Sequence, residues 1–189
     1  MSLIKKVFFG TIWFGFSKLF SSFSNFLLNL ILARLLYPED FGTFAIVTIS
    51  VGLISRLSNI GFGDSIIQKD KTSKSQMSSL FWINLITSLI SAFIIYFLAN
   101  PVAIYYKNEK LVPLIRLMTI DVILTPLFIF HRKILQKEID FKTISIIDIS
   151  LNFLGVTAAI IVALKGGGVY SLIIFPLVRT FFSVIIFPL

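Results

Sequence analysis

The stretch that decides the fold is residues 33–70, which read ARLLYPEDFGTFAIVTISVGLISRLSNIGFGDSIIQKD. It contains the end of one apolar segment, a short turn at Tyr37-Pro38-Glu39-Asp40 and a second apolar segment from Phe41 to Ile67. Proline suits the first turn of a helix, and the two acidic residues stand at the positive end of the helix dipole. The stretch therefore predicts a helix, a tight turn and a second helix.

The second apolar segment is long enough to cross a bilayer, which needs about 20 helical residues. It is not uniformly apolar, because small and polar residues recur at helical spacing along one face. They are Thr48, Gly52, Ser55, Arg56, Asn59 and Gly63. A membrane helix with an arginine on such a face meets protein or water there, so we expect a membrane protein with a polar interior.

The composition supports a membrane environment. Hydrophobic residues make up 57% of the chain and charged residues 14%, against about 25% charged in soluble domains. The net charge of +8 is concentrated in the short gaps between apolar runs. That distribution sets membrane topology and favours contact with membrane lipids, so we expect no nucleic-acid partner. The chain has no cysteine, and we expect neither a metal nor a cofactor.

Six apolar spans predict an all-α membrane protein with one six-helix lobe over residues 1–189. The spans run over about 7–36, 41–67, 80–99, 111–130, 144–164 and 169–189. The first is too long for a cleavable signal peptide. Nine basic residues fall on one side of the membrane and four on the other. The positive-inside rule therefore places the N-terminus and the end of the sixth span in the cytoplasm.

Most of the predicted spans carry polar residues on one face. Two such sets are Lys18, Ser22, Asn25 and Asn29 in the first span, and Ser145, Asp148, Asn152 and Gly155 in the fifth. Helices with one polar face each fit a bundle that encloses a polar cavity.

Four charges lie furthest from the predicted ends of the spans, namely Lys18, Arg56, Asp121 and Arg179. Burying each of them in the membrane costs at least ~2.5 kcal/mol, so each needs a partner or water. One interpretation is an internal ion pair, for example between Asp121 and a basic residue. The other is a cationic cavity for an anionic ligand, which the excess of three basic groups over one acidic group favours. Asp148 lies about one turn from a membrane face, where snorkelling or helix capping is expected.

Residues for enzymatic chemistry are not found in the sequence. It has no serine–histidine–aspartate arrangement, no metal-ligand cluster and no paired carboxylates at a convincing spacing. We therefore expect that the chain is not an enzyme.

Several stretches resemble the polysaccharide-export flippases of bacteria, which are related to the multidrug and lipid II exporters. They are ARLLYPEDFGTFA (33–45), IGFGDSIIQKD (60–70), SSLFWINLI (78–86), LVPLIRLM (111–118), LQKEIDFKTISIIDIS (135–150) and LKGGGVYSLI (164–173). The resemblance implies a multi-pass protein of the bacterial inner membrane that moves undecaprenyl-diphosphate-linked oligosaccharides from the cytoplasmic to the periplasmic leaflet. Such flippases have twelve to fourteen spans, so six spans resemble an N-terminal half that needs a C-terminal half or a second chain.

In such a flippase, Lys18, Arg56 and Arg179 are expected to hold the diphosphate, with Asp121 beside them. Asn25, Asn29 and Asn59 are expected to meet sugar hydroxyls, although asparagines also join membrane helices through amide hydrogen bonds. Two alternatives remain open. One is half of a cation-coupled multidrug antiporter with Asp121 as its coupling carboxylate, and the other is a fragment or scaffold subunit that does not transport.

Overall fold

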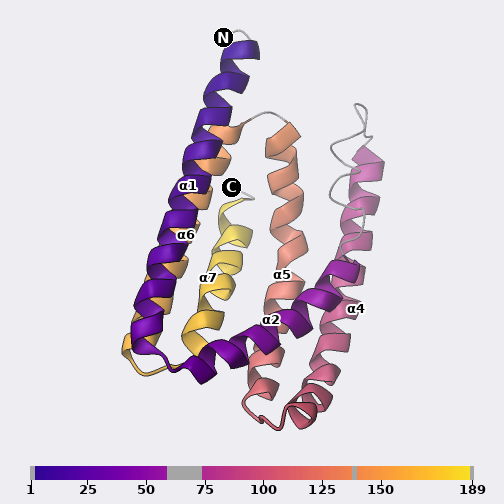
Figure 1. The fold of residues 1–189 in the computed structure, drawn as a ribbon. Helices are drawn as coiled ribbons and strands as arrows, with labels where there is room; N and C mark the ends of the chain where they lie inside the picture. The colour runs from indigo at the N-terminus through magenta and orange to yellow at the C-terminus, as the bar shows by residue number, and fades with distance from the viewer. Residues whose placement is uncertain (1–2, 59–73, 138–139, 188–189) are drawn as a thin grey trace. The chain divides into compact units, whose positions relative to one another are not determined.

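Long apolar runs with few helix breakers form six helices in the computed structural model, which describes residues 3–58, 74–137 and 140–187. The helices are α1 (Leu3–Leu35), α2 (Pro38–Ser58), α4 (Lys74–Tyr105), α5 (Leu111–Lys137), α6 (Phe141–Leu164) and α7 (Tyr170–Ile186) (Figure 1). No strand occurs within these described ranges. The prediction of an all-α protein is confirmed.

The turn between α1 and α2 forms as predicted. Pro38 is the first residue of α2, and Glu39 and Asp40 lie in its first turn. The Tyr37 backbone N–H donates to Asp40 Oδ2 at 3.2 Å. A carboxylate three residues into a helix that accepts from the capping residue forms half of a capping box. This contact explains why α2 begins at Pro38.

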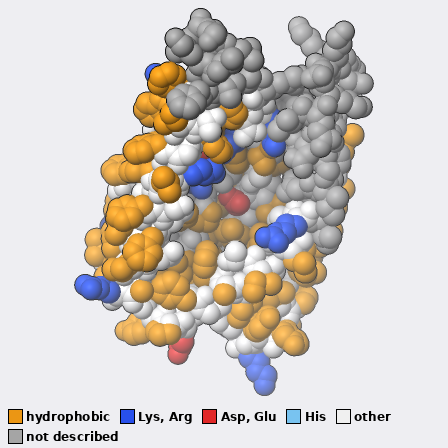
Figure 2. Space-filling model, turned by 45° about the horizontal axis from the view of Figure 1, so that its top comes forward, with side chains coloured by type: hydrophobic (Ala, Val, Ile, Leu, Met, Phe, Trp, Pro, Cys, Tyr) orange, Lys and Arg blue, Asp and Glu red, His pale blue; other side chains and the backbone are white. Residues whose placement is uncertain are grey.

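Apolar helices with exposed hydrophobic side chains make this an all-α membrane protein. Four described segments are long and apolar enough to cross a membrane: Phe9–Leu35, Phe81–Tyr105, Leu111–Lys133 and Phe141–Leu164. The α7 helix is apolar but shorter, and α2, described only to Ser58, is not among the four. Figure 2 shows hydrophobic side chains over much of the face in view. The prediction of six spans in one lobe therefore remains a prediction.

Two helices extend well beyond the predicted spans. The α4 helix covers 74–105 instead of 80–99, and α5 continues to Lys137 instead of ending at residue 130. No glycine or proline follows residue 130 before the helix ends, and arginine, lysine, leucine and glutamine are all good helix formers. The predicted end of the second span at residue 67 lies outside the described residues.

Contacts between residues divide the chain into two compact units. The first unit contains residues 1–36 and 131–189, and thus α1, the last turns of α5, α6 and α7. The second unit contains residues 37–130, and thus α2, α4 and most of α5.

Within the second unit, α2 contacts α4. Asn108, in the turn between α4 and α5, donates from Nδ2 to Thr43 Oγ1 of α2 at 3.2 Å. On the other side of that turn, the Arg116 guanidinium of α5 lies 4.5 Å from the centre of the Tyr96 ring of α4. These polar contacts hold the turn against α2 and α5 against α4.

Within the first unit, α6 contacts both α1 and α7. The Phe14 and Phe141 rings lie 5.8 Å apart, edge to face, and Asn25 is hydrogen-bonded to Asn152. Both pairs are 127 positions apart in the sequence, so α1 and α6 run parallel in one constant register. Buried apolar residues of all three helices fill the spaces between them, including Leu28, Leu32, Ile144, Leu151 and Ile173.

The α6 and α7 helices approach each other closely at Gly155. A Cβ atom at this position would lie 3.0 Å from Phe175 Cδ2 and 3.1 Å from the Phe175 carbonyl oxygen. The ring can turn away, but a backbone carbonyl cannot move without moving its helix. Glycine therefore sets the distance between these two helices.

Gly155→Ala should force α6 and α7 apart and destabilise the first unit by about 1–3 kcal/mol, as overpacking does. Thermal unfolding of the purified protein in detergent measures this change. Gly15→Ala is the matched control, because Gly15 is also helical and no atom lies within 4 Å of its added methyl group. Equal stability of the two variants would contradict the close contact.

Candidate functional site

The α6 helix presents a buried polar face. Ser145, Asp148 and Asn152 are all buried, as is Gly155 one turn further along the helix. Ser145 donates its hydroxyl to the Phe141 carbonyl oxygen at 2.6 Å, within its own helix. Asp148 and Asn152 instead reach side chains of other helices. Helical periodicity predicts that these residues share one face, and in the structure this face points inward.

Asp148 forms a bidentate ion pair with Arg132, in the last turns of α5. Arg132 Nη1 donates to Asp148 Oδ1 at 3.0 Å, and Arg132 Nη2 donates to Asp148 Oδ2 at 2.7 Å. The side chain of Asp148 is 4% exposed and that of Arg132 18% exposed. Two parallel charge-assisted hydrogen bonds in a mostly dry environment fix the positions of both groups.

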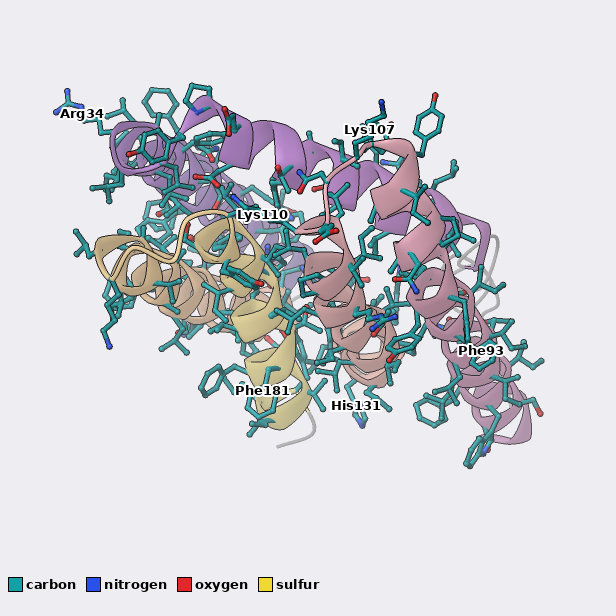
Figure 3. The ribbon with its side chains drawn as sticks, turned by 90° about the horizontal axis from the view of Figure 1, so that it is seen from below. Arg34, Phe93, Lys107, Lys110, His131 and Phe181 are labelled. Carbon is teal, nitrogen blue, oxygen red and sulfur yellow. The ribbon has the colours of Figure 1, made fainter. Side chains whose placement is uncertain are left out.

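Arg179 of α7 approaches the same carboxylate less closely. Its Nη2 lies 4.0 Å from Asp148 Oδ1, beyond hydrogen-bonding distance, and its side chain is 35% exposed. Phe181 is two residues further along α7 and therefore on the opposite side of the helix, where it points outward (Figure 3). Arg179 thus lies on the α6 side of its helix with part of its guanidinium accessible.

The cluster of Arg132, Asp148 and Arg179 has a net positive charge, because it contains two arginines and one aspartate. Arg132 places both of its Nη groups on Asp148, whereas Arg179 makes no hydrogen bond to that carboxylate. A guanidinium has five N–H donors in a planar fork that matches phosphate and carboxylate oxygens. The arrangement can therefore hold an anion against Arg179, and it offers neither a nucleophile nor a general base in an open position.

Asn152 continues the polar face one turn after Asp148. Its Nδ2 donates to Asn25 Oδ1 of α1 at 3.2 Å. Its Oδ1 is buried, and no donor among the described residues reaches it. The amide pair joins α1 to α6, as the alternative role for Asn25 predicted.

The other residues predicted for the site are distributed over both units. Lys18 and Asn29 are exposed on α1, and Lys18 Nζ lies 5.3 Å from the Phe14 ring centre. In the second unit, Asp121 is half-buried on α5 and Arg56 is exposed on α2. Arg56 lines a hollow of about 350 Å³, together with Thr48, Ile49, Gly52 and Leu53. Asn59 lies outside the described residues.

The structure corrects two interpretations of charged residues. Asp148 was expected to snorkel or to cap a helix near a membrane face, but it is buried and ion-paired. Arg132 lies beyond the predicted end of the fourth span at residue 130, but α5 extends past it and brings it to α6. The signal for Asp148 was its place on the polar face of the fifth span. The sequence indicated the position of Arg132 less clearly, because that position depends on where α5 ends.

Residues 31–189 match the model of a family described as "Polysaccharide biosynthesis protein". The chain is 25% identical over 163 residues to the lipopolysaccharide biosynthesis protein WzxC of Escherichia coli K12, covering 86% of this chain and 33% of WzxC. It is 33% identical over 96 residues to the teichuronic acid biosynthesis protein TuaB of Bacillus subtilis 168, covering 51% of this chain and 20% of TuaB.

The succinoglycan biosynthesis transport protein ExoT of Rhizobium meliloti 1021 is 27% identical to the chain over 146 residues, which are 76% of this chain and 29% of ExoT. The chain therefore spans a third or less of the length of these relatives. No solved structure matches it.

Removing one partner of the Arg132–Asp148 pair should destabilise the protein strongly. Arg132→Met and Asp148→Leu should each lower the free energy of unfolding by about 3–5 kcal/mol, because each leaves a largely buried charge without its hydrogen-bonded counter-ion. The double variant should lose much less than the sum of the two single changes. Thermal unfolding in detergent measures this non-additivity, and Lys165→Met, at an exposed position of the same unit, is the control. Additive losses would mean that the two residues do not interact.

Proposed function

This chain belongs to the polysaccharide biosynthesis protein family, and on that basis we propose that it is part of an exporter of lipid-linked oligosaccharides. The substrate is an oligosaccharide joined through a diphosphate to a prenyl lipid, and it moves from the cytoplasmic to the periplasmic leaflet of the bacterial inner membrane. The match to a transport protein of succinoglycan biosynthesis supports transport over catalysis. The apolar helices support a membrane location, which this transport step requires.

The observation that carries the proposal is a partly accessible arginine inside a membrane helix unit. A diphosphate that leaves water needs fixed positive charge and hydrogen-bond donors in the membrane. The Arg179 guanidinium is partly exposed and lies too far from the Asp148 carboxylate to hydrogen-bond to it. In the second unit, Arg56 is exposed beside a hollow. We propose that Arg179, Arg56 and Lys18 are the cationic groups that attract the diphosphate.

The sugar part of the substrate needs neutral polar partners. In this proposal, Asn29 and Asn59 donate to and accept from sugar hydroxyls, and Asp121 accepts from them. Asn25 has a smaller share in binding, because its Oδ1 already accepts from Asn152. The prenyl tail remains in the lipid, alongside the apolar outer faces of the helices.

The working exporter contains more helices than these six in this proposal. The relatives extend well beyond the matched segment, which covers 33% of WzxC and 29% of ExoT. Transporters of this kind commonly enclose their site between two halves that rock against each other. The remaining helices belong either to the same polypeptide or to a second chain.

The proposed orientation places both ends of the six-helix segment in the cytoplasm. Reporter domains fused after Lys74 and Lys137 should be cytoplasmic, and one fused after Lys107 should be periplasmic, because the flanking basic residues follow the positive-inside rule. Alkaline phosphatase and green fluorescent protein fusions measure the two locations. The reverse pattern would overturn this orientation.

Loss of the protein should block export. Deleting its gene should cause lipid-linked oligosaccharide to accumulate inside the cell and surface polysaccharide to decrease. Arg179→Ala and Arg56→Ala in the complete transporter should each weaken diphosphate binding by roughly ten- to a hundredfold, or about 1.5–3 kcal/mol. Arg56→Lys should retain part of the function, because lysine keeps the charge but not the bidentate fork.

The control for these export measurements is Arg34→Ala. Arg34 lies in the last turn of α1 and points outward (Figure 3). Lipid-linked oligosaccharide is quantified in membrane extracts, and surface polysaccharide is measured against the abundance of each variant in the membrane. Normal export in the deletion strain would overturn the proposed function. Normal export by Arg56→Ala would transfer the phosphate-binding role to Arg179 and Lys18.

A further inference from the structure

Asp148 holds its two arginine neighbours unequally. Both Asp148 oxygens accept from Arg132, at 3.0 and 2.7 Å, so the edge of the carboxylate that a guanidinium fork recognises is occupied. Arg179 approaches only Oδ1, from 4.0 Å. A second bidentate pair cannot form on the same carboxylate edge. Asp148 thus attracts Arg179 electrostatically but does not occupy its N–H donors.

We propose that Asp148 is a positioning residue that limits how tightly this site binds the diphosphate of the substrate. Arg132 fixes the carboxylate in place, and the carboxylate attracts the Arg179 guanidinium while repelling any phosphate that binds there. This inference rests on the proposed export function. It assigns different roles to the two arginines, since Arg132 is a structural counter-ion and Arg179 is the residue that binds the anion.

The charges and the burial explain why such a residue is useful. An arginine in a partly buried site binds phosphate strongly, and a carrier that holds its substrate too tightly cannot release it. A negative charge about 4 Å from the binding group weakens the bound state, because charges interact strongly where water is excluded. Asp148 is 4% exposed, so neither solvent nor salt screens it effectively.

Local packing keeps Arg179 close to Asp148. Gly155 of α6 lets Phe175 of α7 approach closely, one turn before Arg179. Ser183 donates its hydroxyl to the Arg179 carbonyl oxygen at 2.8 Å and occupies that backbone group. The position of the Arg179 backbone is therefore set by the contact between α6 and α7, and the side chain can still turn toward a ligand.

A purely structural cluster and a site that limits affinity predict opposite results for Asp148→Asn. If the cluster only holds helices together, the substitution lowers stability and cannot improve anion binding. In the present proposal, it removes the repulsion and tightens binding. Arg132→Gln/Asp148→Asn gives a second test, because it removes the buried pair as a unit and leaves only Arg179 charged.

The test measures binding of inorganic diphosphate to the purified full chain in phosphatidylcholine nanodiscs by isothermal titration calorimetry. Asp148→Asn and the double variant should each lower the Kd by about tenfold, which corresponds to about 1.4 kcal/mol. Arg179→Ala should weaken binding by roughly ten- to a hundredfold in both the wild-type and the Asp148→Asn backgrounds. Arg34→Ala should bind like the wild type, and thermal unfolding verifies that each variant is folded.

Three results would overturn the inference. The first is that both Asp148 variants bind diphosphate as weakly as the wild type or more weakly. The second is that no folded form of the protein binds diphosphate. The third is that phosphatidylglycerol in the nanodiscs displaces diphosphate, which would assign the site to a bilayer headgroup. The outcome is separable from the export function. Cells that accumulate lipid-linked oligosaccharide after gene deletion would support export even where the Asp148 variants failed to bind more tightly.

Discussion

A carboxylate that is almost fully buried in an apolar helix bundle has to find its counter-charge inside the protein. Asp148 does so by drawing in Arg132 from the end of α5 and by attracting Arg179 from α7. Two segments, the end of α5 and α7, are therefore tied to one group on α6. The arrangement of the first unit depends on this constraint, because moving any of these segments by a few ångströms would leave an ion without its partner in a medium that cannot solvate it.

Association of helices in a membrane lacks the hydrophobic driving force that packs soluble cores, so close contacts and buried polar pairs take its place. The first unit uses both. Gly155 lets α6 and α7 approach until a carbonyl oxygen and a ring contact the glycine, and the Asn25–Asn152 pair joins α6 to α1. The same helix therefore carries the charged site and the two devices that hold its neighbours in place.

Much of this fold can be predicted from the sequence, because the patterns that encode it are local. Tyr37-Pro38-Glu39-Asp40 specifies a helix start through backbone chemistry within four residues, and the structure contains it. The polar face of α6 follows from helical periodicity alone. The partner of Asp148 could not be predicted in this way, since it depends on how far α5 continues beyond residue 130 and on the angle at which it meets α6. Periodicity identifies which side of a helix is polar, but it does not identify the group that lies opposite.

The constant separation of 127 positions between α1 and α6 also has a consequence for biosynthesis. The ribosome adds roughly 5 to 20 residues per second, so α1 emerges roughly 6 to 25 seconds before the helix beside which it finally lies. During this interval Asn25 has no Asn152 to accept from, and the face of α1 that later contacts α6 is open to lipid or to the insertion machinery. The first unit closes only after the whole second unit has been synthesised. Its assembly is therefore a late event, and α1 depends on temporary partners that the finished protein does not contain.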